Sequence, residues 1–154
     1  KKLLVTGLAV IFALALTAPT ATAVEKSPAR AKLIKMIKDA RTTHPQISVT
    51  EAQMLMTTDP ELLVIDVREP AEFKAGNVAG AIHIPRGLLE FKLIKREKNL
   101  NRPILIYCRS GARASFAGEK LTELGYTNVK NMTGGYLAYA KAMKTKTSVC
   151  FVAS

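Results

Sequence analysis

The chain has 154 residues, a length that suits one domain with a single hydrophobic core. Lysine and arginine outnumber aspartate and glutamate by 23 to 12, which gives a formal net charge of +11 at pH 7. This charge can favour anionic partners. No stripe of aromatic and basic residues accompanies it, so the sequence does not indicate a nucleic-acid-binding protein. We therefore expect a solvated basic surface that draws small anions toward the molecule.

Residues 1–23 have the pattern of a secretory signal. Lys1 and Lys2 precede an uncharged apolar run, and Ala21 and Ala23 occupy the small-residue positions that signal peptidase reads. The run is shorter than the roughly 20 residues that a transmembrane helix needs. We expect cleavage after Ala23, a periplasmic or secreted bacterial protein, and no stable membrane insertion after cleavage. An uncleaved membrane anchor is the alternative.

Residues 24–46 begin with a basic, polar linker and continue with an amphipathic helix. Leu33, Ile34 and Ile37 share one helical face, and lysines occupy the rest of the helix. We expect this helix to dock on the domain and to end before Pro45. A membrane-surface role is less favoured, because the apolar face is short.

Residues 47–143 alternate between short apolar runs and helical patterns. Strands are predicted at residues 61–67, 80–85, 103–108 and 128–132, and helices at residues 69–76, 88–96, 113–125 and 135–143. A further helical stretch follows Ser48, with Ala52, Leu55 and Met56 facing inward. This alternation predicts an α/β fold in which a small parallel sheet carries helices on both faces. Residues 144–154 form a C-terminal tail in this prediction.

Local patterns refine two of these helices. Ser48 and Glu51 have the spacing of a capping box at the start of a helix. In the helix at residues 113–125, we expect Phe116, Leu121 and Leu124 to face the core.

A cysteine ends the third predicted strand, and a short basic loop follows the cysteine. Residues 108–113 read CRSGAR: the nucleophile candidate Cys108, then Arg109, Ser110, Gly111, Ala112 and Arg113. Ligands of parallel sheets bind beyond the carboxyl ends of the strands. The glycine permits a tightly curled loop, whose N–H groups and following helix N-terminus together favour an anion. We expect the thiol to ionise more readily than a free cysteine, beside a pocket for a small anion.

Two other interpretations of this loop are less favoured. A cysteine that ends a buried strand is often only a small apolar residue, but this does not explain the adjacent arginines and glycine. Cysteine phosphatases place five residues between the nucleophile and the phosphate-binding arginine. Here four residues separate Cys108 from Arg113. The shorter loop suits a single sulfur atom better than a tetrahedral phosphate, and no general-acid aspartate is evident.

From about residue 47 to residue 142 the sequence resembles the rhodanese sulfurtransferases, in their single-domain form. The segments that carry the resemblance are LLVIDVREPAEFKAGNVAGAIHIP, ILIYCRSGARAS and NMTGGYLAY, in this order. The resemblance implies a rhodanese-like α/β domain over residues 47–143. It also implies Cys108 as the catalytic nucleophile, with residues 109–113 binding the substrate.

The resemblance implies a thiosulfate sulfurtransferase that works in two half-reactions. Cys108 takes the outer sulfur of thiosulfate or a similar anionic donor, and the resulting persulfide passes it to cyanide or a thiol. No metal or organic cofactor is implied. A persulfide-carrying module that delivers sulfur to a partner protein is the alternative, and a cysteine phosphatase or arsenate reductase is a weaker one. The oligomeric state cannot be read from the sequence.

Charged residues near the predicted site have two interpretations. Asp66 and Arg68 end the strand beside that of Cys108, so they are candidates for support of the loop. The favoured interpretation is an ion pair or helix cap that fixes the following turn. We interpret Glu72 and Arg86 as structural.

The remaining cysteine and the histidines have no assigned chemistry. Cys150 is interpreted as a bystander, and a resolving thiol or a disulfide with Cys108 are the alternatives. His44 and His83 are isolated in the sequence, which favours packing or surface positions over metal binding.

Overall fold

The computed structural model describes residues 27–152, with side chains to residue 145. The predicted signal lies outside the described residues, as does the side chain of Cys150. The helices and strands follow in the order α2 (Pro28–Ala40), β1 (Gln46–Ile47), α3 (Val49–Thr58), β2 (Leu63–Asp66), α4 (Pro70–Lys74), β3 (Ile82–His83), the 3₁₀ helix η1 (Arg86–Leu88), α5 (Leu89–Arg96), β4 (Ile104–Tyr107), α6 (Ala112–Glu123), β5 (Val129–Met132) and α7 (Gly135–Val152).

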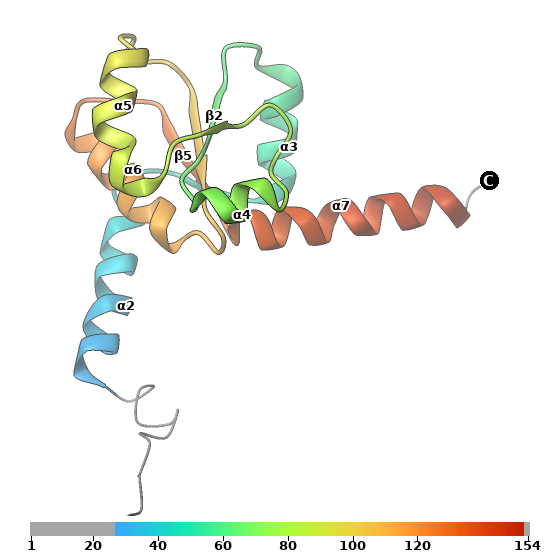
Figure 1. Cartoon of the computed structure of the whole chain (residues 1–154), viewed down its shortest axis with the longest axis horizontal. Helices are drawn as coiled ribbons and strands as arrows, with labels where there is room; N and C mark the ends of the chain where they lie inside the picture. Colours follow the sequence, from blue (N-terminus) through green and yellow to red (C-terminus); the bar gives the residue numbers. More distant parts are fainter. Residues whose placement is uncertain (1–26, 153–154) are drawn as a thin grey trace, which may run out of the picture.

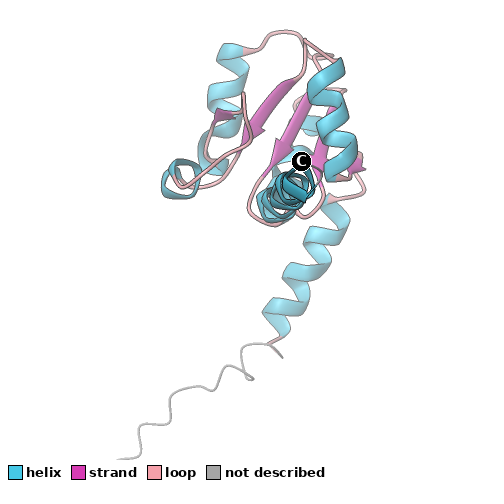
Figure 2. Ribbon diagram, turned by 90° about the vertical axis from the view of Figure 1, so that its right-hand side faces the viewer, coloured by secondary structure: helices cyan, strands magenta, loops and turns pink. Residues whose placement is uncertain are grey.

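The strands form one five-stranded parallel sheet in the order β1-β5-β4-β2-β3. β4 lies in the middle and pairs with β2 on one side and β5 on the other. All residues of β2 and β4 are buried, as their continuous apolar runs predict. The helices cover both sides of the sheet (Figure 2), so the predicted fold class is confirmed.

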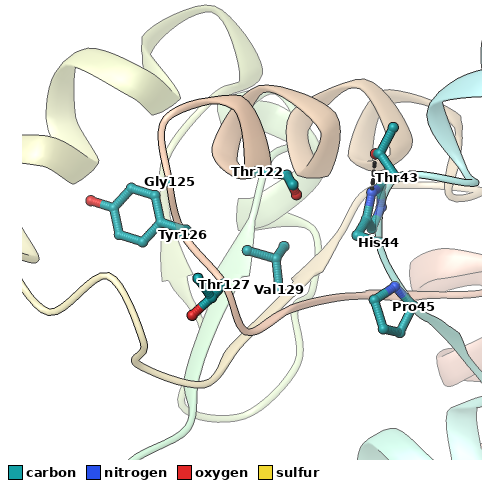
Figure 3. A pocket seen from close by; sticks show the side chains of 8 residues that line it. All are labelled: Thr43, His44, Pro45, Thr122, Gly125, Tyr126, Thr127 and Val129. Atoms are coloured by element: carbon teal, nitrogen blue, oxygen red, sulfur yellow. Dashed lines mark hydrogen bonds between the residues drawn. The ribbon is translucent and has the colours of Figure 1, made fainter.

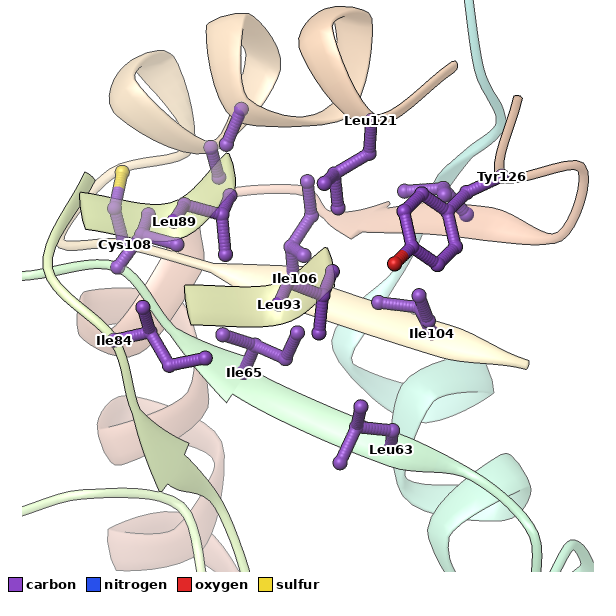
Figure 4. Close-up of a cluster of buried hydrophobic side chains, with 14 residues drawn as sticks. Leu63, Ile65, Ile84, Leu89, Leu93, Ile104, Ile106, Cys108, Leu121 and Tyr126 are labelled. Carbon is purple, nitrogen blue, oxygen red and sulfur yellow. The ribbon is translucent and has the colours of Figure 1, made fainter. Parts of the chain in front are cut away.

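Each face of the sheet has its own hydrophobic core. One core joins alternate residues of β2 and β4 to α5 and α6, and includes Cys108 (Figure 4). The other contains Val64, Leu105 and Tyr107, and packs against residues of α3 and α7. Because successive strand residues point to opposite faces, each short strand contributes to both cores.

The predicted capping box is confirmed at the start of α3. The Glu51 N–H donates to Ser48 Oγ at 3.2 Å, and the Ser48 N–H donates to Glu51 Oε2 at 2.7 Å. These reciprocal bonds satisfy two of the N–H groups that a helix start leaves without an internal partner. α3 therefore begins where the sequence predicts.

The prediction for α6 is wrong at Leu124. Leu121 is fully buried, but Leu124 is 44% exposed. The helix ends at Glu123, and Leu124 is its C-cap, after which Gly125 at φ +93° turns the chain away. The inward face consists instead of Ala114, Ala117 and Leu121, with Phe116 only partly buried.

Helices α2 and α7 extend beyond the body of the molecule in different directions (Figure 1). α2 packs against α6, as docking on the domain requires, yet Leu33 and Ile34 remain about half exposed. α7 continues through residues 144–152, which the sequence assigned to a tail. None of the helices formed by residues 27–152 is sufficiently long and apolar to span a membrane.

Candidate active site

Cys108 follows the central strand directly, at the carboxyl edge of the sheet. It is 1% exposed, and its sulfur lies at one end of the row of core side chains in Figure 4. Gly111, at φ +97°, is the N-cap of α6, and its N–H donates to Cys108 Sγ at 3.2 Å. A side chain with a Cβ resists this left-handed conformation. The glycine thus lets the loop fold back so that an amide and the positive end of a helix face the sulfur.

A polar network holds the loop from behind. Ser115 Oγ donates to the carbonyl oxygen of Gly111 at 2.8 Å, and Asn131 Nδ2 lies 3.3 Å from the same oxygen. Arg41 Nε donates to Ser115 Oγ at 3.3 Å, which links the end of α2 to this network. Ser115 and Asn131 are fully buried, so their hydrogen bonds are shielded from water. The network fixes the orientation of the Gly111 peptide groups.

The start of α7 holds the loop from the other side. The Tyr136 N–H donates to the Cys108 carbonyl at 2.8 Å, and the Leu137 N–H donates to the Arg109 carbonyl at 3.1 Å. Gly135 allows this close approach: it has φ +57°, and a Cβ on it would contact the Cys108 carbonyl oxygen and lie 2.8 Å from Arg109 C and O. The two residues at the start of the loop are therefore fixed by backbone hydrogen bonds to a separate helix.

The loop arginines have different environments. Arg109 and Ser110 are exposed to solvent. Arg113 is only 34% exposed and donates to both carboxylate oxygens of Glu72, at 2.7 and 2.8 Å. This bidentate pair lowers the pKa of Glu72 to about 2, and it raises the pKa of Arg113, with a smaller contribution from nearby Cys108. Glu72 therefore orients one of the predicted substrate-binding arginines.

Asp66 and Arg68 form a buried ion pair beneath the start of α7. The Arg68 guanidinium donates to both Asp66 oxygens at 2.7–3.0 Å, and Nη2 also donates to the Gly76 carbonyl at 2.6 Å. The guanidinium lies 4.1 Å from the ring centroid of Tyr136, the residue whose N–H binds the Cys108 carbonyl. The pair thus fixes the turn and, through Tyr136, also contacts the support of the loop.

The residues interpreted as structural have clear packing partners. His83 Nε2 lies 2.8 Å from the Arg68 carbonyl oxygen, and its ring stacks on Phe73 at 4.7 Å. Arg86 pairs with Glu90 at 2.7 Å. Among the described residues, neither the His83 nor the Arg86 side chain forms a hydrogen bond, ion pair or ring contact with the cysteine loop.

His44 lies between α2 and β1, is buried, and packs against Gly118 in the middle of α6. Its Nδ1 bonds the Thr43 hydroxyl at 2.9 Å, and burial lowers its pKa. It lines a pocket of about 130 Å³ with residues of the α6–β5 turn (Figure 3). α6 begins at the cysteine loop and ends at this turn, so the pocket is separate from the site. Within residues 27–145, no cluster of three or more His, Cys, Asp and Glu side chains could hold a metal ion.

A comparison with protein-family models gives a match over residues 48–142, to the family described as a rhodanese-like domain. The chain belongs to this family. A sulfurtransferase of Allochromatium vinosum is 37% identical over 90 residues, which is 58% of this chain and 81% of that protein. Thiosulfate sulfurtransferase PspE of Escherichia coli is 36% identical over 70 residues, which is 46% of this chain and 67% of that protein.

A solved structure confirms the fold of this family. The polysulfide-sulfur transferase homodimer of Wolinella succinogenes has a TM-score of 0.64 and 31% sequence identity, covering 73% of this chain and 84% of that one. The chain is thus a rhodanese-like protein with several sulfurtransferases among its relatives. The match begins at residue 48, so α2 precedes the family domain.

The structure brings most of the predicted site residues together, and it adds others. Residues 108–111 form one loop at the sheet edge, and Ala112 and Arg113 begin α6. The sequence did not identify the support from Arg41, Ser115 and Asn131, nor the role of Tyr136. These residues come from separate elements, and only the tertiary structure brings them to the loop.

Proposed function

We propose that the protein transfers sulfane sulfur from thiosulfate, or a similar donor, to a thiophilic acceptor through a persulfide on Cys108. One observation carries the proposal: the Gly111 N–H donates to Cys108 Sγ at the N-terminus of α6. This arrangement stabilises negative charge on the Cys108 sulfur, because the N–H group that donates to it is fixed before the reaction begins. The family membership and the names of the relatives support the same chemistry.

In the first half-reaction, the Cys108 thiolate attacks the outer sulfur of thiosulfate. The bond between the two sulfur atoms of thiosulfate breaks, and its electron pair leaves with sulfite. Cys108 then carries a persulfide anion, so the total charge is unchanged. Arg109 is exposed on the loop and supplies a positive charge for the anionic donor, and the Cys108 side chain contributes to the raised pKa of Arg113.

The first test is persulfide formation on the purified protein. Treatment with thiosulfate should raise the intact mass by one sulfur atom, and Cys108→Ser should abolish the increase. Thiocyanate formation from thiosulfate and cyanide should disappear in the same variant. Equal thiocyanate formation by the wild type and the variant would refute the proposal.

Two further measurements refine the proposal. A carrier module would form the persulfide but turn over slowly with free cyanide or thiol, so steady-state rates distinguish a carrier from an enzyme. A panel with thiosulfate and polysulfide identifies the donor, since one similar structure is that of a polysulfide-sulfur transferase.

We also propose that the protein is exported through residues 1–23. The support is the sequence pattern of charged, apolar and small residues. Edman sequencing of the protein recovered from the periplasm or medium should begin at Val24. A recovered chain that retains the apolar run would refute cleavage after Ala23.

A further inference from the structure

A groove beside the cysteine loop lies mostly outside the family domain. It has a volume of about 390 Å³ and is lined by Ile34, Ile37, Lys38, Arg41, Ser110 and Ala112. The first four residues belong to α2 and its C-cap, and they precede residue 48, where the family match begins. Pockets for organic ligands usually measure about 300–1,000 Å³. The groove thus has room for an organic molecule, which is more than a small inorganic anion needs.

The groove has a positive wall. Lys38 and Arg41 both line it, and no carboxylate of the described residues forms an ion pair with either of them. The neighbouring acid on this helix, Asp39, binds Lys35 at 2.7 Å and lines a different groove. The charge in this groove is therefore complementary to an anion.

The groove is coupled to the active loop through Arg41. Arg41 Nε donates to Ser115 Oγ, and Arg41 Nη2 lies 3.7 Å from the point that a Cβ added to Gly111 would occupy. Ser115 in turn bonds the Gly111 carbonyl, and the Gly111 N–H bonds Cys108 Sγ. α2 is therefore anchored at the cysteine loop, and the groove borders Ser110 and Ala112, the residues on either side of the glycine whose N–H binds the sulfur.

Two isoleucines give the same groove an apolar surface. Ile34 is 54% exposed and Ile37 is partly buried, and both line the groove. Carbon atoms of a ligand that cover these side chains would remove apolar surface from water. Thiosulfate has no such atoms, so these residues favour an organic molecule.

We infer that this groove binds the sulfur acceptor, and that the acceptor is an organic thiol with carboxylate groups. Its carboxylates pair with Lys38 and Arg41, and its carbon chain covers Ile34 and Ile37. The inference rests on the proposed function and names the acceptor class for it. The acceptor thiol first loses its proton to solvent. Its thiolate then attacks the outer sulfur of the Cys108 persulfide; the persulfide S–S bond breaks, and its electron pair stays on Cys108.

The test uses protein loaded with thiosulfate and two thiol acceptors, glutathione and the uncharged 2-mercaptoethanol. Lys38→Gln should raise KM for glutathione about five-fold, the upper range for one exposed ion pair, and leave kcat within two-fold. Lys38→Glu should raise KM about ten-fold. KM for 2-mercaptoethanol should change by less than two-fold. The matched control is Lys35→Gln on the same helix, because Lys35 does not line the groove; it should leave both KM values unchanged.

A binding experiment without turnover provides an independent measure. S-methylglutathione cannot accept sulfur, and its titration should shift the amide resonances of Ser110 and Ala112, with weaker binding to Lys38→Glu. Equal KM values for glutathione in the wild type and Lys38→Glu would overturn the inference. A concentration-dependent shift of α2 resonances without thiol would identify a second copy of the chain as the occupant, and would also overturn it. Failure of the persulfide to form would refute the proposed function itself, which separates the two failures.

Discussion

Gly135→Ala tests whether the close contact of α7 with the cysteine loop positions the nucleophile. The substitution places a methyl group against the Cys108 carbonyl oxygen and 2.8 Å from the Arg109 carbonyl carbon, so the loop or the helix must move. Overpacking of this kind costs about 1–3 kcal/mol. The left-handed φ of +57° adds a further penalty of about 1–2 kcal/mol for a residue with a Cβ. We therefore expect a total loss of about 2–5 kcal/mol in the free energy of unfolding.

A second glycine provides the matched control. Gly80 also has a left-handed φ, at +76°, but a Cβ on it would meet no atom within 4 Å. Gly80→Ala should therefore cost only the conformational penalty, about 1–2 kcal/mol. The difference between the two variants isolates the contact with the cysteine loop.

Two assays read out the effect. Urea unfolding followed by circular dichroism gives the free energies, a suitable probe because the chain has no tryptophan. Intact mass against time after addition of thiosulfate gives the rate of persulfide formation. This rate should fall at least ten-fold in Gly135→Ala under native conditions and stay within two-fold in Gly80→Ala. Equal stability losses in the two variants, together with an unchanged rate in Gly135→Ala, would refute the reasoning.

Three further predictions concern the surrounding side chains. Glu72→Gln removes the anionic partner of Arg113 and should lower the free energy of unfolding by roughly 1 kcal/mol at pH 6. Since the folded-state pKa of Glu72 is about 2, this stability difference from the wild type should shrink as pH falls from 4.5 toward 2. Urea titrations measure the difference, and a difference that stays constant with pH would contradict the prediction. Asp66→Asn leaves Arg68 buried without its carboxylate and should cost about 3–5 kcal/mol, whereas an unchanged urea midpoint would show that the pair contributes nothing. Leu121→Ala should cost about 2–5 kcal/mol and Leu124→Ala less than 1 kcal/mol in the same unfolding assay, and equal losses would contradict the burial difference between the two leucines.

The sequence predicts the central part of the fold because that part is encoded locally. The continuous apolar runs of β2 and β4 and the capping box of α3 are each set by a few adjacent residues. β1, by contrast, has two residues, which is too short for any periodicity, and exists because Gln46 and Ile47 pair with β5. Leu124 fits the helical period, but the helix ends before it, and a period cannot mark where the chain turns.

The candidate site likewise has a part that the sequence predicts and a part that it does not. CRSGAR is a contiguous signal, so the nucleophile and its loop could be predicted from the sequence. The buried network of Arg41, Ser115 and Asn131 draws on three separate elements, and none of these residues is unusual in its own segment. Similarly, nothing in the segment around Glu72 predicts its pairing with Arg113, which lies 41 residues away in the sequence. Residues that act through other residues carry no local pattern.

The place of β4 in the middle of the sheet has a consequence for local opening of the native state. Native proteins open in cooperative units, and peripheral segments exchange their amide hydrogens before central ones. β1 and β3, with two residues each at the sheet edges, should exchange early, and β4, paired on both sides, should exchange last. The peptide that carries the nucleophile is thus attached to the slowest-exchanging strand. Local opening of the edge strands β1 and β3 should therefore leave the position of the Cys108 sulfur unchanged.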